Sequence, residues 1–282
     1  MNYTFSLIIL FIGLSGIVAQ VVLLRELLVS FYGNELTIGV ILANWILSEA
    51  LGVFLIGKFI DKVRNKINVF IGLQVIFSFA LPVVLYLSRT FKTISGIPFG
   101  EGVALPLIFF ASLIIILPVA FCHGALFSVC SSLTYSIGRM YIWETLGTIT
   151  GGLILAYLFI PYLNSFQIIF FIAGLNLVIA INFISPKKIK YLALLVLIFA
   201  GLFLNKIPDY LEKYSIEKQW RGLKVLDYKN SVYGNVCVTK NAREYTFFYN
   251  GIPVITTPFP DRQFVEELGN LPLLFHQAPK DI

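Results

Sequence analysis

The fold is decided by apolar runs such as Leu36–Gly57, whose sequence is LTIGVILANWILSEALGVFLIG. Roughly 20 apolar residues suffice for a helix to cross a bilayer, and Glu49 is the one charged residue in this run. A seventh run, Tyr191–Leu204, has only 14 residues and could be a span or an interfacial helix. We therefore expect a membrane-embedded all-α bundle of six or seven transmembrane helices. The other five long runs are Phe5–Leu24, Ile67–Leu87, Val103–Phe127, Tyr141–Ile160 and Phe166–Ile184.

The composition supports this interpretation and excludes an ordinary soluble enzyme. Only 13% of the 282 residues are charged, and the mean hydropathy is +0.85, whereas soluble domains carry about 25% charged residues. The net charge of +6 comes from short basic loops between the apolar runs, so it does not predict a nucleic-acid partner. The three cysteines are scattered and predict no disulfide framework.

Positive charges in the loops indicate the orientation. Lys and Arg are enriched in cytoplasmic loops, and the loops after the second, fourth and sixth runs carry most of these residues. The sequence therefore predicts a multi-pass protein of the inner (cytoplasmic) membrane, with the lipid bilayer as its partner and the N-terminus inside. The basic residues on that side are Lys58, Lys62, Arg64, Lys66, Arg139, Lys187, Lys188 and Lys190, against Arg25, Arg89 and Lys92 on the other.

The chain divides at about residue 204 into this helical domain (1–204) and a more polar tail. Residues 205–222 are expected to form a linking or interfacial amphipathic helix, and residues 223–282 a small α+β piece. Asn250-Gly251 is typical of a hairpin turn, because both central positions of a type I′ turn need positive φ. Asp261 can cap a helix through Phe264–Phe275, which Pro272 must bend or end. The expected strands are Leu223–Lys229, Tyr233–Lys240, Glu244–Tyr249 and Ile252–Thr257.

Charged residues inside apolar runs are candidates for function, because a charge in mid-membrane must face a partner or a wet cavity. Glu49 and Glu144 lie inside such runs, and Arg25 lies at the end of one. We expect Arg25 to pair with Glu49, and Glu144 with Arg139. Structural pairing is the favoured interpretation. The functional alternative is a proton-coupled or cation-coupled site for a small amine.

Three further features have a structural and a functional interpretation. Asp61 lies in a basic loop whose pattern is similar to the loop 2–3 signature of major facilitator transporters. The structural alternative is a basic stop signal in which Asp61 is one compensating carboxylate. His123 lies beside Cys122, and we expect helix packing and no metal site. Gly147–Gly152 predicts close helix contact rather than a phosphate loop, since no strand or lysine accompanies it.

Several segments occur in an order that resembles one family. In the helical part they are Ser15–Leu27 (SGIVAQVVLLREL), Gly33-Asn34, the stretch holding Gly52, Gly57 and Asp61, and Gly138–Gly147 (GRMYIWETLG). Together they resemble membrane-embedded proteins that fuse a facilitator-like helical domain to a spermidine synthase (polyamine aminopropyltransferase) domain. The tail adds Ser231–Val236 (SVYGNV), Tyr249–Pro253 (YNGIP) and Glu266–Leu274 (EELGNLPLL). These follow the order of that enzyme's N-terminal β domain and the helix leading to its Rossmann core.

The resemblance implies transfer of an aminopropyl group from decarboxylated S-adenosylmethionine to a diamine such as putrescine. It implies Tyr233, Asp261 and Glu266 as residues that line the substrate site. The family's glycine-rich turn and acidic pair would follow Ile282, so we expect a truncated reading frame with no catalytic residue and no bound cofactor. Because the co-substrate is made in the cytosol, we expect a cytoplasmic tail, with Tyr191–Leu204 in the interface or re-entering.

The tail departs from soluble spermidine synthases at positions that contact cofactor or diamine. Gly234 and Val254 each stand in place of Gln, Phe264-Val265 in place of Tyr-His, and Asn270 in place of His. These differences put the usual polyamine specificity in question. Two alternatives remain open: a transporter or amine-binding membrane module with a vestigial tail, and a membrane anchor. Six spans are half of a usual facilitator, so transport would require a homodimer or another design.

Overall fold

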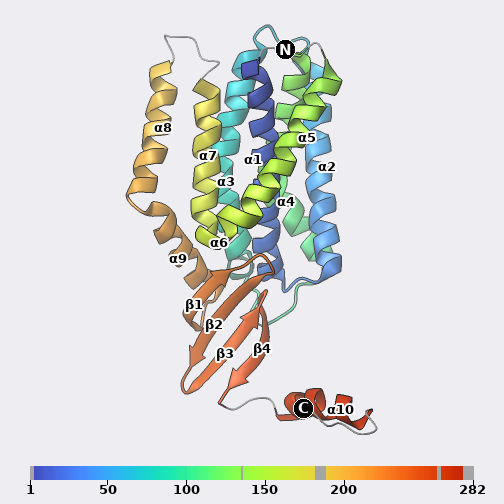
Figure 1. The fold of residues 1–282 in the computed structure, drawn as a ribbon, viewed down its shortest axis with the longest axis vertical. Coiled ribbons are helices and arrows are strands. Elements are labelled where there is room, and N and C mark those ends of the chain that lie inside the picture. The colour runs from blue at the N-terminus through green and yellow to red at the C-terminus, as the bar shows by residue number, and fades with distance from the viewer. Residues whose placement is uncertain (1–2, 99, 135, 182–188, 259–261, 276–282) are drawn as a thin grey trace.

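A computed structural model describes residues 3–98, 100–134, 136–181, 189–258 and 262–275. The protein is mostly helical, with a small antiparallel sheet near the C-terminal end (Figure 1). Five helical stretches in the described residues are long and apolar enough to cross a membrane, which confirms the first five predicted spans. They are α1 (Tyr3–Phe31), α2 (Glu35–Ile60), α3 (Lys66–Ile94), α4 (Leu105–Ser132) and α5 (Ile137–Ile154), which continues through a π-helical turn (Leu155–Phe159) into α6 (Ile160–Tyr162).

Two shorter apolar helices complete the bundle. Helix α7 (Ser165–Ile181) corresponds to the sixth predicted run, and α8 (Ile189–Leu204) to the seventh. Helix α8 packs beside α7, and the chain then bends by 63° into α9 (Ile207–Gln219). The predicted linking helix is therefore present, and it packs on α3 and α7 with Ser215 and Ile216 buried.

The N-terminal end of α1 and the sheet lie at opposite ends of the bundle (Figure 1). The α2–α3 loop, which carries Lys62 and Arg64, and the N-terminal turn of α5, which carries Arg139, lie at the same end of the bundle as the N-terminus. This arrangement differs from the expectation that the N-terminus and the tail share the cytoplasmic side. The difference arises because α8 runs along α7 instead of lying across the end of the bundle.

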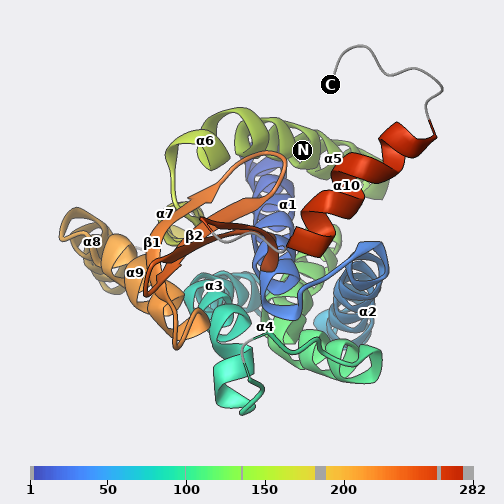
Figure 2. The same ribbon diagram turned by 90° about the horizontal axis from the view of Figure 1, so that it is seen from below.

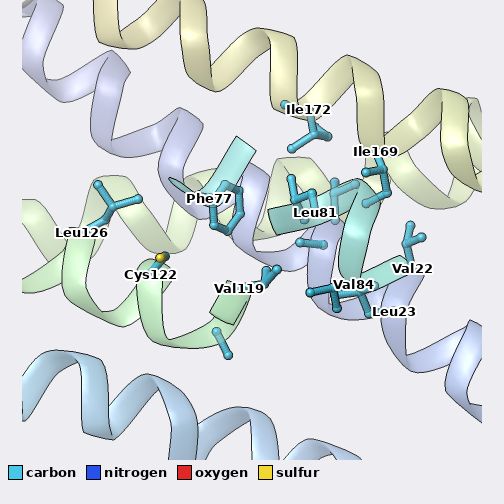
Figure 3. Close-up of a cluster of buried hydrophobic side chains, with 14 of the residues drawn as sticks. Val22, Leu23, Phe77, Leu81, Val84, Val119, Cys122, Leu126, Ile169 and Ile172 are labelled. Atoms are coloured by element: carbon cyan, nitrogen blue, oxygen red, sulfur yellow. The ribbon is translucent and has the colours of Figure 1, made fainter. Parts of the chain in front are cut away.

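Helix α1 lies in the middle of the bundle, where it contacts α3, α4, α5 and α7 (Figure 2). Its apolar side chains meet those of α3, α4 and α7 in a continuous core, of which Figure 3 shows one part. Val22, Phe77, Val119 and Ile169 represent the four helices in this cluster. Such a core holds α1 in place along its length.

Glycines allow the closest helix contacts. A Cβ atom added at Gly147 would lie 1.9 Å from the carbonyl oxygen of Leu10, and one at Gly52 would lie 2.2 Å from that of Phe121. Only a residue without a side chain permits backbones to approach so closely. These contacts join α1 to α5 and α2 to α4, and confirm the predicted packing role of Gly147.

The sheet is an antiparallel meander in the order β1-β2-β3-β4. Asn250 and Gly251 have φ of +48° and +85°, which confirms the hairpin prediction. Strand β2 begins later than predicted, because Ser231 and Gly234 exchange backbone hydrogen bonds that close a turn. The four strands of the sheet are β1 (Lys224–Asn230), β2 (Asn235–Asn241), β3 (Glu244–Tyr249) and β4 (Ile252–Thr257).

Helix α10 (Arg262–Leu274) follows the sheet and lies beyond its free end (Figure 1). The predicted helix is therefore present, and Pro272 lies within its last turn. The predicted cap, Asp261, lies outside the described residues.

Candidate cation site in the helix bundle

A cavity of about 300 Å³ lies between α1, α2, α4 and α5. Its lining includes two carboxylates, Glu49 from α2 and Glu144 from α5, together with the imidazole of His123 from α4. At 1.5 Å per residue, these groups lie about 10–16 Å from the ends of their helices. The cavity is therefore a polar site within the membrane-spanning length of the bundle.

His123 and Glu49 form a hydrogen-bonded pair. The Nδ1 atom of His123 faces Oε1 of Glu49, and Nε2 lies 3.3 Å from the carbonyl oxygen of Ile12. A carbonyl only accepts hydrogen bonds, so Nε2 must carry a proton. A second proton then lies between Nδ1 and Oε1. Whichever atom holds it, the pair has no net charge.

Glycines of neighbouring helices fix the backbones and the imidazole around the cavity. A Cβ atom at Gly16 would lie 2.1 Å from Nε2 of His123, so the imidazole occupies the space above this glycine. Cβ atoms at Gly124 and Gly13 would each lie 2.1 Å from the carbonyl oxygens of Glu49 and Glu144, respectively. The two acidic residues therefore lie at close backbone contacts of α2 with α4 and of α1 with α5.

Glu144 is the unbalanced charge of the site. Its carboxylate accepts a hydrogen bond of 3.3 Å from Thr148 on the same helix. Among the described residues, no Lys, Arg or His nitrogen lies within 4.0 Å of it. The prediction that Glu144 pairs with Arg139 is therefore wrong. Both residues lie on α5, and Glu144 lines the cavity between α1, α2, α4 and α5.

The prediction that Arg25 pairs with Glu49 is also wrong. Arg25 lies near the C-terminal end of α1. Its Nη2 atom donates a hydrogen bond of 2.6 Å to the carbonyl oxygen of Ser231. It therefore holds the β1–β2 turn against the bundle. Asp61, at the other end of the molecule, forms an exposed ion pair with Lys66, with 2.9 Å between Oδ1 and Nζ.

A second charged cluster joins the bundle to the sheet end. Arg89 of α3 is 1% exposed, and its guanidinium donates to Glu26 of α1 at 2.7 and 2.8 Å and to Glu212 of α9 at 2.8 Å. Ser165 and the backbone N–H of Phe166 donate to the two carboxylates, at 2.6 and 3.3 Å. Ser165 and Phe166 are the first two residues of α7. The positive end of this helix's dipole stabilises the two negative charges that Arg89 alone does not balance.

Aromatic rings enclose this cluster. The guanidinium carbon of Arg89 lies 5.5 Å from the ring centroid of Phe166 and 5.6 Å from that of Tyr228 in β1. Burial, followed by the Glu26 carboxylate, raises the pKa of the Tyr228 phenol well above its usual value. Because the charges are held by neighbours from five elements, α1, α3, α7, α9 and β1, we interpret the cluster as one that joins these elements.

The structure does not bring Tyr233 and Glu266 together, because the β1–β2 turn and α10 lie at different ends of the sheet. Tyr233 lies in the β1–β2 turn with 86% of its surface exposed, and Glu266 is exposed on α10, beyond the sheet. Asp261 lies outside the described residues. Tyr233 is thus wrongly placed by the strand prediction, and its carbonyl accepts a hydrogen bond from the phenol of Tyr249.

Sequence reasoning missed His123, Glu26 and Arg89 as members of polar clusters. His123 was interpreted as a packing residue, although a histidine within an apolar run is itself a signal of a polar partner. Arg89 lies two residues after the predicted third run, Ile67–Leu87, so the sequence pattern assigns it to a loop. The helix continues to Ile94 and carries Arg89 inside the protein.

In comparisons with known proteins, no family model, no curated protein and no solved structure matches this chain. Within the described part of the chain, no three His, Cys, Asp or Glu side chains are grouped to hold a metal ion. In its described residues the protein is mostly helical, with five helical stretches of membrane-spanning length, a small antiparallel sheet and an acidic cavity lined by α1, α2, α4 and α5.

Proposed function

We propose that this chain is part of a membrane-bound enzyme of the aminopropyltransferase type, acting in polyamine biosynthesis. In this proposal the helical domain is facilitator-like, and the sheet corresponds to the N-terminal β domain of spermidine synthase. The observation that carries the proposal is the order of elements after the bundle. Four antiparallel strands, with the Asn250-Gly251 hairpin between the last two, precede helix α10, as the motif order requires.

The reaction would form a carbon–nitrogen bond between a diamine and the aminopropyl group of decarboxylated S-adenosylmethionine. The carbon–sulfur bond of the sulfonium breaks, methylthioadenosine leaves, and the attacking amine loses a proton to a base. Acidic residues are suited to binding the diamine and accepting that proton. In this chain Tyr233, Asp261 and Glu266 are proposed only to line the site, and no residue is proposed as catalytic.

The proposal is tested with methylthioadenosine and the full-length product of the gene. Calorimetry should show saturable binding of the nucleoside, and the codons after Ile282 should encode a glycine-rich strand-to-helix turn and an acidic pair. A full-length product that binds no methylthioadenosine at millimolar concentration would refute the transferase assignment.

The acidic cavity favours a second candidate, a membrane module that binds or carries an amine. Glu49, His123 and Glu144 lie inside the bundle, away from the sheet. A pure anchor needs no such groups, and charged side chains within a membrane are costly. Replacing Glu144 with glutamine separates these functions, because an anchor would tolerate the change, whereas an amine site would lose the charge that holds its ligand.

Sidedness discriminates between the two candidates. The α2–α3 loop with Lys62 and Arg64, and the first turn of α5 with Arg139, lie at the end of the bundle away from the sheet. If the positive-inside rule applies to this end, the sheet would lie on the non-cytoplasmic side, where a cytosolic co-substrate would not reach it. A reporter fused after Ile282 that is active only in the cytoplasm supports the transferase. Activity only outside supports the amine module.

A further inference from the structure

We propose that the cavity between α1, α2, α4 and α5 binds the primary ammonium group of a small organic amine, with Glu144 as its counter-ion. The inference rests on the second candidate function, the amine-binding module, and specifies its site and its ligand class. It does not depend on the transferase assignment.

The charge balance of the cavity calls for one cation. The Glu49–His123 pair carries one shared proton and is neutral, as its hydrogen bonds require. Helix α1 contributes no titratable group to the lining, and α5 contributes Tyr141 and Glu144. Glu144 therefore supplies a single negative charge that no cationic side chain among the described residues neutralises within 4.0 Å. A carboxylate within membrane-spanning helices requires a partner of opposite charge or a wet cavity.

The shape and lining favour an organic cation over a metal ion. A volume of about 300 Å³ lies at the lower end of the range for small-molecule sites, roughly 300–1,000 Å³, and far exceeds the space of a single ion. The described residues include no cluster of three metal-ligating side chains. Ile17 and Tyr141 also line the cavity and can supply apolar contacts to the carbon stem of an alkylamine.

The polar lining matches the three N–H donors of a primary ammonium. Glu144 accepts one, and the side-chain oxygens of Gln20 and Thr148, which also line the cavity, are available for the others. A quaternary ammonium has no N–H to donate and would leave these oxygens unpaired. The site should therefore prefer butylammonium and 1,4-diaminobutane to tetramethylammonium.

The test measures binding of these three probes, and of potassium, to the full chain in lipid nanodiscs by calorimetry. Butylamine and 1,4-diaminobutane should bind, with tetramethylammonium and potassium much weaker. The variant Glu144→Gln keeps the size of the side chain and should weaken butylamine binding about 10- to 100-fold, as expected for loss of one charged hydrogen bond. Asp61→Asn is the matched control, because Asp61 is an exposed carboxylate distant from the cavity, and it should bind like the parent.

The outcomes separate this inference from the amine-binding function itself. If the parent binds butylamine and Glu144→Gln binds it equally well, an amine-binding protein remains but the assigned site is wrong. If neither amine binds the folded parent, both the site and the amine-binding function are refuted. Binding of potassium or tetramethylammonium as tight as that of butylamine overturns the assigned ligand class. Thermal unfolding of each variant establishes that the bundle is intact.

Discussion

Replacing Arg89 with methionine should detach the sheet end from the helix bundle. Methionine fills a similar volume but leaves the carboxylates of Glu26 and Glu212 without their shared cation. Three charge-assisted hydrogen bonds of 2.7–2.8 Å would be lost, together with the contact to Ser215 at 2.9 Å. All three charged groups are buried, so water cannot replace these bonds.

The magnitude follows from burial. Removing one partner of a buried ion pair costs about 3–5 kcal/mol, because the remaining charge is left unpaired. Arg89→Lys keeps the charge but cannot make the forked contact, so its cost should be smaller. Lys66→Met is the matched control. Its ion pair with Asp61 is exposed, and exposed pairs contribute about 0–1 kcal/mol.

The fluorescence of Trp220 reports the detachment. This side chain is 1% exposed and packs edge-on against Phe248 of the sheet, with ring centroids 4.8 Å apart. Denaturant titration in a background with Trp45 and Trp143 replaced by phenylalanine isolates its signal. Arg89→Met should move the Trp220 midpoint well below that of the parent, while Lys66→Met leaves it unchanged. Equal midpoints for Arg89→Met and the parent would show that the cluster does not hold the sheet.

Three further perturbations test other parts of the structure. Gly147→Ala should destabilise the bundle by several kcal/mol, the usual cost of overpacking being about 1–3 kcal/mol or more, whereas Gly152→Ala on the same helix has open space and should not. Thermal unfolding compares the two, and equal effects would contradict the contact. Burial raises the pKa of the Cys237 thiol to about 12, from 9.0. Because the unfolded thiol ionises first, sheet stability should fall between these pH values, and Cys237→Ala should remove that loss when urea titrations are run across the range. Asn250→Pro should disorder the hairpin, since proline cannot adopt the observed φ of +48°, and an unchanged proteolysis pattern of the tail would argue against this.

The helices and strands could be predicted from the sequence because their signals are local. Apolar length indicates spans, and Asn250-Gly251 indicates a hairpin whatever the rest of the chain does. The exceptions have local causes as well. Helix α3 extends past Leu87 because Arg89 finds buried partners from other helices, and hydropathy alone assigns such a residue to a loop.

The partners of charged residues could not be predicted, because they depend on how helices distant in the chain pack together. Glu49 and Arg25 lie on neighbouring runs and are natural candidates for a pair. The actual contacts place His123 beside Glu49 and Ser231 beside Arg25. The glycine at position 16 makes the first of these possible, and nothing local to residue 16 indicates that an imidazole must fit there.

The buried cluster also constrains how the protein is made. Glu26 belongs to α1, which leaves the ribosome before α3 with Arg89 and before α9 with Glu212 and Ser215. The carboxylate of Glu26 therefore has no cationic partner until α3, which carries Arg89, has been made. The cluster is complete only after α9 has followed. Insertion and final assembly become separate events in biogenesis. A ribosome stalled before α9 would leave a nascent product that quality-control proteases can distinguish from the finished protein.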